Sequence, residues 1–166
     1  MRFSLSSLLL PIGFGLSCAA APAHAQSRPN SGELELAVSI VDGCTLSTTD
    51  VVFGLIIGTS GAIRSVGAVD VQCTADLDFT ISMDRGLHSL GANRRMYNPA
   101  NSAYIRYALY SDAGYSRPWT DRNAGKVRGN SGATGRITYP VYGEMTFDGM
   151  PVSGTYEDQV TVTIEF

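Results

Sequence analysis

The side chains that could carry out catalytic chemistry are few in this chain. His88 could act as a general base, but no recognisable nucleophile motif stands beside it, so a Ser-His-Asp arrangement is not indicated. Two carboxylate pairs could do acid-base work, Asp76 with Asp78 and Glu157 with Asp158. Each pair falls in an expected turn or strand, where solvated or hydrogen-bonded carboxylates are ordinary. The sequence therefore predicts a protein that is not an enzyme and uses no cofactor.

Residues 1–25 have the pattern of a signal peptide. Arg2 precedes an apolar stretch over residues 5–21, and Ala23 and Ala25 give the small-x-small form that a signal peptidase cuts. The apolar stretch is interrupted by proline and glycine and is shorter than the roughly 20 apolar residues that a membrane span needs. We therefore expect cleavage after Ala25 and export of the mature chain.

The cysteine count agrees with export. Of the three cysteines, Cys18 leaves with the signal peptide, and Cys44 and Cys73 remain. In an oxidising compartment such a pair forms a disulfide, and closing a loop of about 30 residues stabilises a fold by roughly 3.5 kcal/mol. Two cysteines and one histidine are too few for a metal site. A lipoprotein anchored through Cys18 is the alternative, but Gly15 stands where a lipobox normally carries leucine.

Composition indicates one soluble β domain. The chain has 166 residues and a formal net charge of −3, which gives no reason to expect binding to nucleic acid or to an anionic membrane. The abundance of glycine and tyrosine, and the absence of a long helical period, predict an all-β fold. We expect residues 26–41 to form a leader and residues 42–166 to form the domain.

Alternating apolar residues predict the strands. In the leader one face of an extended segment carries four aliphatic side chains, Leu34, Leu36, Val38 and Ile40. Short strands are also expected at residues 51–54, 69–73, 77–83, 104–110 and 137–147. Pro140 argues for an edge position or a bulge in the last of these, because proline cannot donate to a β ladder. The glycine-rich residues 125–135 are expected to form a loop.

The segment from Thr155 to Phe166 has the most regular alternation in the chain. One face carries Tyr156, Asp158, Val160, Val162, Ile164 and Phe166, and only Asp158 interrupts its apolar character. The opposite face is polar, which is typical of a strand that is half buried in an antiparallel sandwich. This pattern does not decide whether the strand is paired within its own sheet or by another polypeptide.

An aromatic-rich region over residues 97–119 suggests a further site. It contains five of the eight tyrosines and the only tryptophan. An exposed aromatic surface of this kind could bind sugars or apolar surfaces, and its candidate residues are Tyr104, Tyr110, Tyr115 and Trp119. The interpretation that we favour instead has Tyr107 in the core and the other rings in cross-strand pairs.

Several short motifs, taken in their order, resemble the spore coat protein U domain family, which includes subunits of archaic chaperone-usher pili of the Csu type. The resemblance covers nearly all of the mature chain, and the Gly-x-Tyr-x-Asp block near its end is the most specific part. The motifs are Gly43-Cys44, Val52-Phe53-Gly54, Val71-Gln72-Cys73-Thr74, Arg95-Met96, Tyr107-Ala108-Leu109-Tyr110, Val141-Tyr142-Gly143, and the run from Gly154 to Thr163.

The resemblance implies an immunoglobulin-like antiparallel β-sandwich that lacks its last strand and is completed by a donated one. A periplasmic chaperone would lend the missing strand, an outer-membrane usher would export the subunit, and a neighbouring subunit would then replace the lender. By position the donor residues are Leu34, Leu36, Val38 and Ile40. By position the strand that borders the acceptor groove and binds the chaperone carries Val160, Val162, Ile164 and Phe166.

Other functions stay open at this level. Residues 34–40 could be the first strand of a self-contained sandwich rather than a donor. The protein could then be a free-standing secreted module that binds carbohydrate or a surface, or a component of a spore coat. The function that we expect is a structural subunit of a cell-surface pilus, used in adhesion and biofilm formation and exported through the periplasm.

Overall fold

A computed structural model describes residues 37–56 and 60–166. The predicted signal peptide, and Leu34 and Leu36 of the leader, lie outside the described residues. Residues Ser39–Phe166 form one compact unit, and the fold below is that of this unit.

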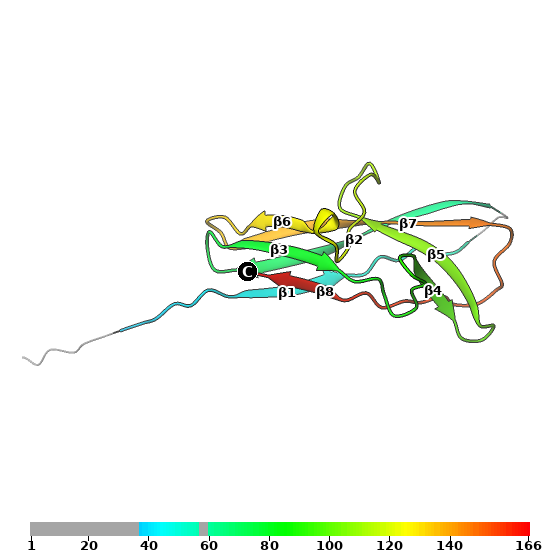
Figure 1. Cartoon of the computed structure of the whole chain (residues 1–166), viewed down its shortest axis with the longest axis horizontal. Helices are drawn as coiled ribbons and strands as arrows, with labels where there is room; N and C mark the ends of the chain where they lie inside the picture. The colour runs from blue at the N-terminus through cyan, green and yellow to red at the C-terminus, as the bar shows by residue number, and fades with distance from the viewer. Residues whose placement is uncertain (1–36, 57–59) are drawn as a thin grey trace, which may run out of the picture. The chain divides into compact units, whose positions relative to one another are not determined.

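The described residues contain eight β-strands and one short 3-10 helix, at Asn123–Gly125. The strands form two antiparallel sheets, one with the order β1-β2-β7-β5-β4 and one with the order β6-β3-β8 (Figure 1). The strand bounds are β1 Cys44–Thr49, β2 Ser60–Cys73, β3 Asp78–Met83, β4 Arg94–Asn98, β5 Ala103–Tyr110, β6 Val127–Asn130, β7 Arg136–Asp148 and β8 Val162–Glu165.

The two sheets pack face to face around one apolar core. The larger sheet contributes Val69, Val71, Leu109 and Val141, and the smaller sheet contributes Phe79, Ile81 and Met83. All of these side chains are buried, and each comes from a strand whose inward residues alternate with more exposed ones. The predicted all-β antiparallel sandwich is therefore confirmed.

Trp119 occupies the centre of this core. Its side chain is completely buried, and its indole Nε1–H donates a hydrogen bond to the Ile81 carbonyl at 3.1 Å. The prediction that Trp119 belongs to an exposed aromatic surface is therefore wrong. A tryptophan in an irregular segment between β5 and β6 has no alternation that could reveal its burial.

The disulfide between Cys44 and Cys73 is present as predicted. The two residues lie directly opposite each other in the pairing of β1 with β2. The bond ties the first residue of β1, an edge strand with few buried side chains, to the last residue of β2. This link matters because β1 pairs with no other strand in the described part of the chain.

Some strand predictions differ from the structure. Residues 51–54 are not a strand but follow β1, whereas β2 extends back to Ser60 through residues expected to form a loop. The expected loop 125–135 contains β6. There Gly129 packs so tightly that a Cβ would collide with the Tyr139 hydroxyl and the Phe79 ring, so this glycine allows close approach rather than flexibility.

Pro140 lies in a central strand, not an edge strand. β7 pairs with β2 along its whole length, with Ala68 opposite Pro140. Its pairing with β5, however, runs only from Tyr142 to Met145. Pro140 therefore lies beyond the end of β5, at a local edge of the sheet, which is where a residue without an N–H is tolerated.

The burial of Trp119 leads to a stability prediction. Trp119→Ala should lower the free energy of unfolding by about 3 to 5 kcal/mol, because it leaves a large cavity and removes the hydrogen bond from the indole to the Ile81 carbonyl. Urea denaturation followed by far-ultraviolet circular dichroism measures this change. Leu87→Ala, at a side chain that is 71% exposed, is the control and should change the free energy by less than about 0.5 kcal/mol.

Candidate functional site

One edge of the smaller sheet is open. β8 pairs with β3 on one side, and no described strand pairs with its other side. The Thr161 carbonyl accepts a hydrogen bond from the Asp84 N–H at 3.0 Å, so the odd-numbered residues direct their backbone groups toward β3. In an antiparallel ladder the alternate residues face the other way. The backbone N–H and C=O groups of Val160, Val162 and Ile164 therefore point toward the open edge.

The continuous stretch before β8 extends this edge to the larger sheet. The Tyr97 N–H donates to the Glu157 carbonyl at 2.8 Å, and the Glu157 N–H donates back to the Tyr97 carbonyl at 3.0 Å. The Leu87 N–H donates to the Gln159 carbonyl at 3.0 Å. The inward-facing backbone groups of this stretch are thus paired while the alternate ones stay open. We call residues 156–162 the edge segment.

An apolar groove of about 1000 Å³ runs beside the edge segment. Residues 48–56, which comprise the end of β1 and the segment after it, and residues 150–155 also line the groove. The floor consists of buried core side chains, Met83, Ile105, Leu109, Val141 and Met145. Four lining side chains are largely exposed, Val52, Leu55, Met150 and Val152. The groove therefore presents an apolar surface of the kind that a partner usually covers.

The structure locates the residues predicted to border an acceptor groove. Val160 and Val162 line the groove and pack on the core, but Ile164 packs on the core without lining the groove. Tyr156 and Asp158 line it instead. The wall of the groove therefore lies further toward Tyr156 than the sequence suggested.

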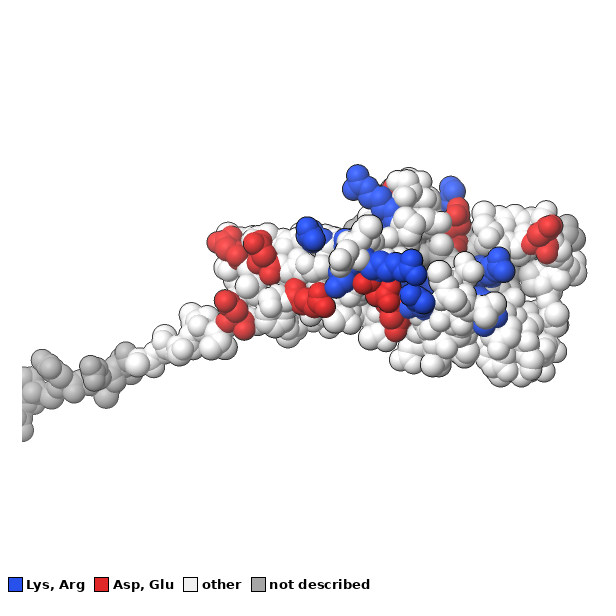
Figure 2. Space-filling model, viewed as in Figure 1, with Lys and Arg blue, Asp and Glu red and all other residues white. Residues whose placement is uncertain are grey.

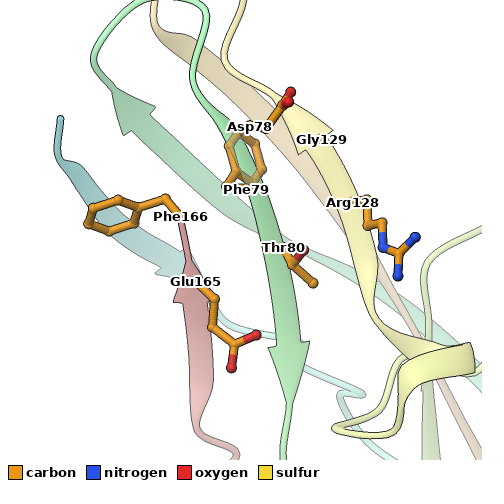
Figure 3. Close-up of a pocket in the computed structure, with 7 residues that line it drawn as sticks. All are labelled: Asp78, Phe79, Thr80, Arg128, Gly129, Glu165 and Phe166. Atoms are coloured by element: carbon orange, nitrogen blue, oxygen red, sulfur yellow. The ribbon is translucent and has the colours of Figure 1, made fainter.

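Phe166 borders a different hollow. It is 60% exposed and, with Glu165, flanks a shallow depression of about 650 Å³ on the strands of the smaller sheet (Figure 3). The other polar side chains around this hollow are Asp78, Thr80 and Arg128. Glu165 is engaged in an ion pair with Lys126 at 2.9 Å. The mixture of polar and apolar groups gives this hollow no evident chemistry.

The described part of the leader is not in a strand. Residues 37–43, which include Val38 and Ile40, precede β1 and belong to no sheet. The Ile40 side chain is 81% exposed.

A largely buried polar cluster forms part of the lining of the groove, through Tyr107 and Asp158. The Asp158 side chain is only 2% exposed and accepts a hydrogen bond from the Tyr107 hydroxyl at 2.6 Å. The His88 backbone N–H and the His88 Nδ1 both lie 3.0 Å from its Oδ1. Burial, together with the hydrogen bond to Asp158, raises the pKa of Tyr107 far above its ordinary value. The only hint of this cluster in the sequence was that Asp158 interrupts an apolar face.

Arg94 supplies the positive charge of this region. It is 7% exposed, and its guanidinium donates to the carbonyls of Asp84 at 2.9 Å and Met83 at 3.1 Å. Burial lowers the pKa of Arg94, against the opposing influence of Tyr107 and the neighbouring aspartates. Among the described residues, no buried side-chain nitrogen or oxygen lacks a hydrogen-bond partner, so the polar groups of this region are all satisfied.

The cluster does not have the form of an active site. His88 and Asp158 make a dyad, but no serine or cysteine side chain contacts the His88 ring in the described residues. Nor do residues 37–56 and 60–166 contain a group of three or more His, Cys, Asp or Glu side chains that could hold a metal ion. No helix among them is long and apolar enough to cross a membrane.

The tyrosines mainly contact one another. Tyr97 and Tyr104 lie opposite each other on β4 and β5, with ring centroids 4.9 Å apart, and the Arg95 guanidinium lies 4.1 Å from the Tyr104 ring. Tyr115 packs edge-on against Tyr110 at 5.5 Å. Tyr97 and Tyr104 thus form a cross-strand pair, as the favoured interpretation had it, whereas Tyr115 lies after β5 and outside the strands. Of the four candidate surface rings, only Tyr104 is exposed, at 47%.

Charges of both signs are present on the face of the molecule shown in Figure 2. Figure 2 shows acidic and basic groups lying among each other over the middle of the visible face, with wide areas that carry no charge. Some are paired, as Arg64 is with Glu144 at 2.8 Å.

These observations define an antiparallel β-sandwich with an open sheet edge beside an apolar groove. Residues 30–163 match the Spore Coat Protein U domain, so the chain belongs to the Spore Coat Protein U domain family. Membership of this family identifies a structural protein rather than an enzyme.

Two known proteins illustrate the likeness. Protein U of Myxococcus xanthus is 31% identical over 114 residues, which are 60% of this chain and 59% of that protein. A chain in the crystal structure of the CsuC-CsuE chaperone–tip adhesion subunit pre-assembly complex, from archaic chaperone-usher Csu pili of Acinetobacter baumannii, superposes with a TM-score of 0.59. That match covers 77% of this chain and 41% of the other at 22% identity, so it concerns the immunoglobulin-like fold.

Asp84 leads to a pH prediction, because its carboxylate braces the start of the open edge. Burial acts to raise its pKa, but hydrogen bonds from the N–H groups of Gly86 and Thr161, both at 2.9 Å, hold the pKa below its ordinary value. A depressed pKa in the folded state gives stability that is present above the unfolded value, near 3.9, and is lost as the pH falls through the folded pKa.

Asp84→Asn should therefore lower the free energy of unfolding by about 1 to 2 kcal/mol at pH 7 and by much less near pH 2. Urea denaturation at a series of pH values measures the difference. Asp148→Asn, at the exposed end of β7, is the control and should have little effect at any pH. An equal loss for Asp84→Asn at both ends of the range would contradict the proposed role of its charge.

Proposed function

We propose that this chain is a structural subunit of a chaperone-usher pilus and that it polymerises by donor-strand exchange. The observation that carries the proposal is the apolar groove beside an edge segment whose alternate backbone groups have no partner among the described residues. The occupant is the leader of another copy of this chain. Its donor residues are Leu34, Leu36, Val38 and Ile40.

The dimensions of donor and groove are compatible. Four inward residues of the edge segment, at positions 156, 158, 160 and 162, line the groove, and the donor offers four aliphatic side chains at the same spacing. Burying four such side chains stabilises the junction by about 6 to 12 kcal/mol before ordering costs. Each added ladder hydrogen bond contributes about 0.5 to 1.5 kcal/mol. A junction of this kind would be long-lived.

The partners follow from the same exposed edge. A sandwich with an uncovered apolar groove and an unpaired strand is prone to aggregation, so it needs a temporary strand before polymerisation. A periplasmic chaperone would supply that strand, and an outer-membrane usher would export the subunit to a surface fibre that serves adhesion and biofilm formation. The fold likeness to a chain of a chaperone–subunit complex supports the chaperone as a partner.

A second candidate function is that of a spore-coat component. The observation in its favour is the description of the family, together with the 31% identity to Protein U. A free-standing sugar-binding module has less support, because most of the candidate tyrosines are covered by one another and Trp119 is buried.

Substitutions in the leader test the proposal. In the full chain, Val38→Asp should reduce the amount of linear multimer at least tenfold, because a charge would have to enter the apolar groove. Ser39→Asp, on the opposite face of the same segment, is the matched control and should polymerise normally. Removal of residues 26–41 should abolish polymerisation. Size-exclusion chromatography with light scattering on protein exported to the periplasm measures all three.

Two results would contradict the proposal. One is multimer formation by the Val38→Asp chain at the level of the unsubstituted chain. The other is an unsubstituted chain that, expressed without a chaperone, is a stable monomer and unfolds reversibly, which is the behaviour expected of a free-standing module.

A further inference from the structure

The edge segment lacks the regular pairing that usually keeps a strand extended. β8 begins only at Val162, and the residues before it contact two different sheets. Glu157 pairs with Tyr97 of β4, whereas Thr161 accepts a hydrogen bond from Asp84, next to the end of β3. The part of the groove wall before Val162 therefore crosses between the sheets without belonging to either. Its backbone hydrogen bonds go to three separate segments, at Tyr97, Leu87 and Asp84, and form no continuous ladder, so a side chain that joins the edge segment to the rest of the fold would add to its restraint.

Asp158 lies in the middle of this crossing. It is the only acidic residue on the inward-facing row of the edge segment, and its side chain is 2% exposed. Its oxygens bind two separate parts of the fold. Tyr107 donates from β5 of the larger sheet, and His88 lies within hydrogen-bond distance, through both its backbone N–H and its ring, from the loop between β3 and β4.

The backbone of the loop between β3 and β4 fits closely against the Asp158 carboxylate. A Cβ at Gly86 would collide with the Asp158 Oδ2, and Gly86 has a φ of +81°, so only glycine lets the loop approach this closely. The buried Arg94 adds a compensating positive charge. An apolar side chain could fill the same space, but it could not join the edge segment to Tyr107 and His88.

We propose that Asp158 is the positioning residue of the groove wall: by binding Tyr107 and His88 it holds the edge segment extended, with the backbone groups of its even-numbered residues directed to an incoming strand. This role rests on the proposed donor-strand function. It gives a physical reason for an acidic residue in an otherwise apolar row. Without the anchor, an incoming strand would have to order the edge segment as it binds, and binding would weaken.

Donor binding by the full chain tests this role. The Val38→Asp chain, which cannot donate its own leader, is titrated into a fluorescein-labelled synthetic peptide of residues 33–41, and anisotropy gives the dissociation constant. Adding Asp158→Asn should raise the dissociation constant at least tenfold. Adding Tyr107→Phe, which removes one hydroxyl and keeps the ring, should raise it at least threefold.

Matched controls separate this role from general damage. Asp112→Asn changes an exposed carboxylate that accepts hydrogen bonds from Ser116 and Arg117, and Tyr139→Phe changes another partly buried tyrosine. Both should leave the dissociation constant within twofold. The dissociation constant is compared only among variants that circular dichroism shows to be folded.

Hydrogen exchange gives a second readout that a purely structural role would not produce. In the folded Asp158→Asn chain the amides of Glu157 and Leu87, which bond across to Tyr97 and Gln159, should exchange at least tenfold faster. Amides in the centre of β2 and β7 should keep their protection.

The results distinguish the positioning role of Asp158 from donor-strand exchange itself. If both substituted chains are folded and bind the peptide as tightly as their parent, the positioning role is wrong and donor-strand exchange stands. If the Val38→Asp chain itself does not bind the peptide, donor-strand exchange is wrong, and the positioning role falls with it. If Asp158→Asn does not fold, Tyr107→Phe decides alone.

Discussion

The feature on which the structure depends is a row of backbone groups that point away from β3. Val160 and Val162 have inward side chains that belong to the core, while their N–H and C=O groups face an open edge. A buried strand cannot leave such groups unpaired without cost, and water can reach them only while the groove stays open. The same residues therefore stabilise the sandwich and present the open edge at which we propose that a donated strand binds.

The rest of the fold keeps that edge available. The long pairing of β2 with β7 gives the larger sheet a rigid centre that does not depend on the edge segment. The disulfide secures the start of β1, the strand whose other end lines the groove. The edge segment is held on its paired side by backbone hydrogen bonds to Tyr97 and Asp84. The Asp158 side chain adds a hydrogen bond from Tyr107. The stability of the fold thus comes mainly from the pairing of β2 with β7, whereas the open edge belongs to β8 and the edge segment.

Several features could be predicted from local pattern. The alternation between Tyr156 and Ile164 appears in the structure as alternating burial, and Cys44 and Cys73 form the disulfide that their pairing predicted. Predictions failed where the deciding contact was distant in sequence. Gly129 looked like a loop residue, yet it lies in β6 opposite Phe79, where Phe79 and Tyr139 leave no room for a side chain.

The sequence by itself determined which side chains of each strand face inward, because the period of two is a property of the extended backbone. The order of the short motifs along the chain also indicated the family to which the protein belongs. Only the tertiary structure decided which edge stays open, where the groove begins, and why Asp158 stands in an apolar row. Those depend on β4, β5 and the β3–β4 loop meeting at one point, and no local pattern encodes the partners of a residue 50 or more positions away.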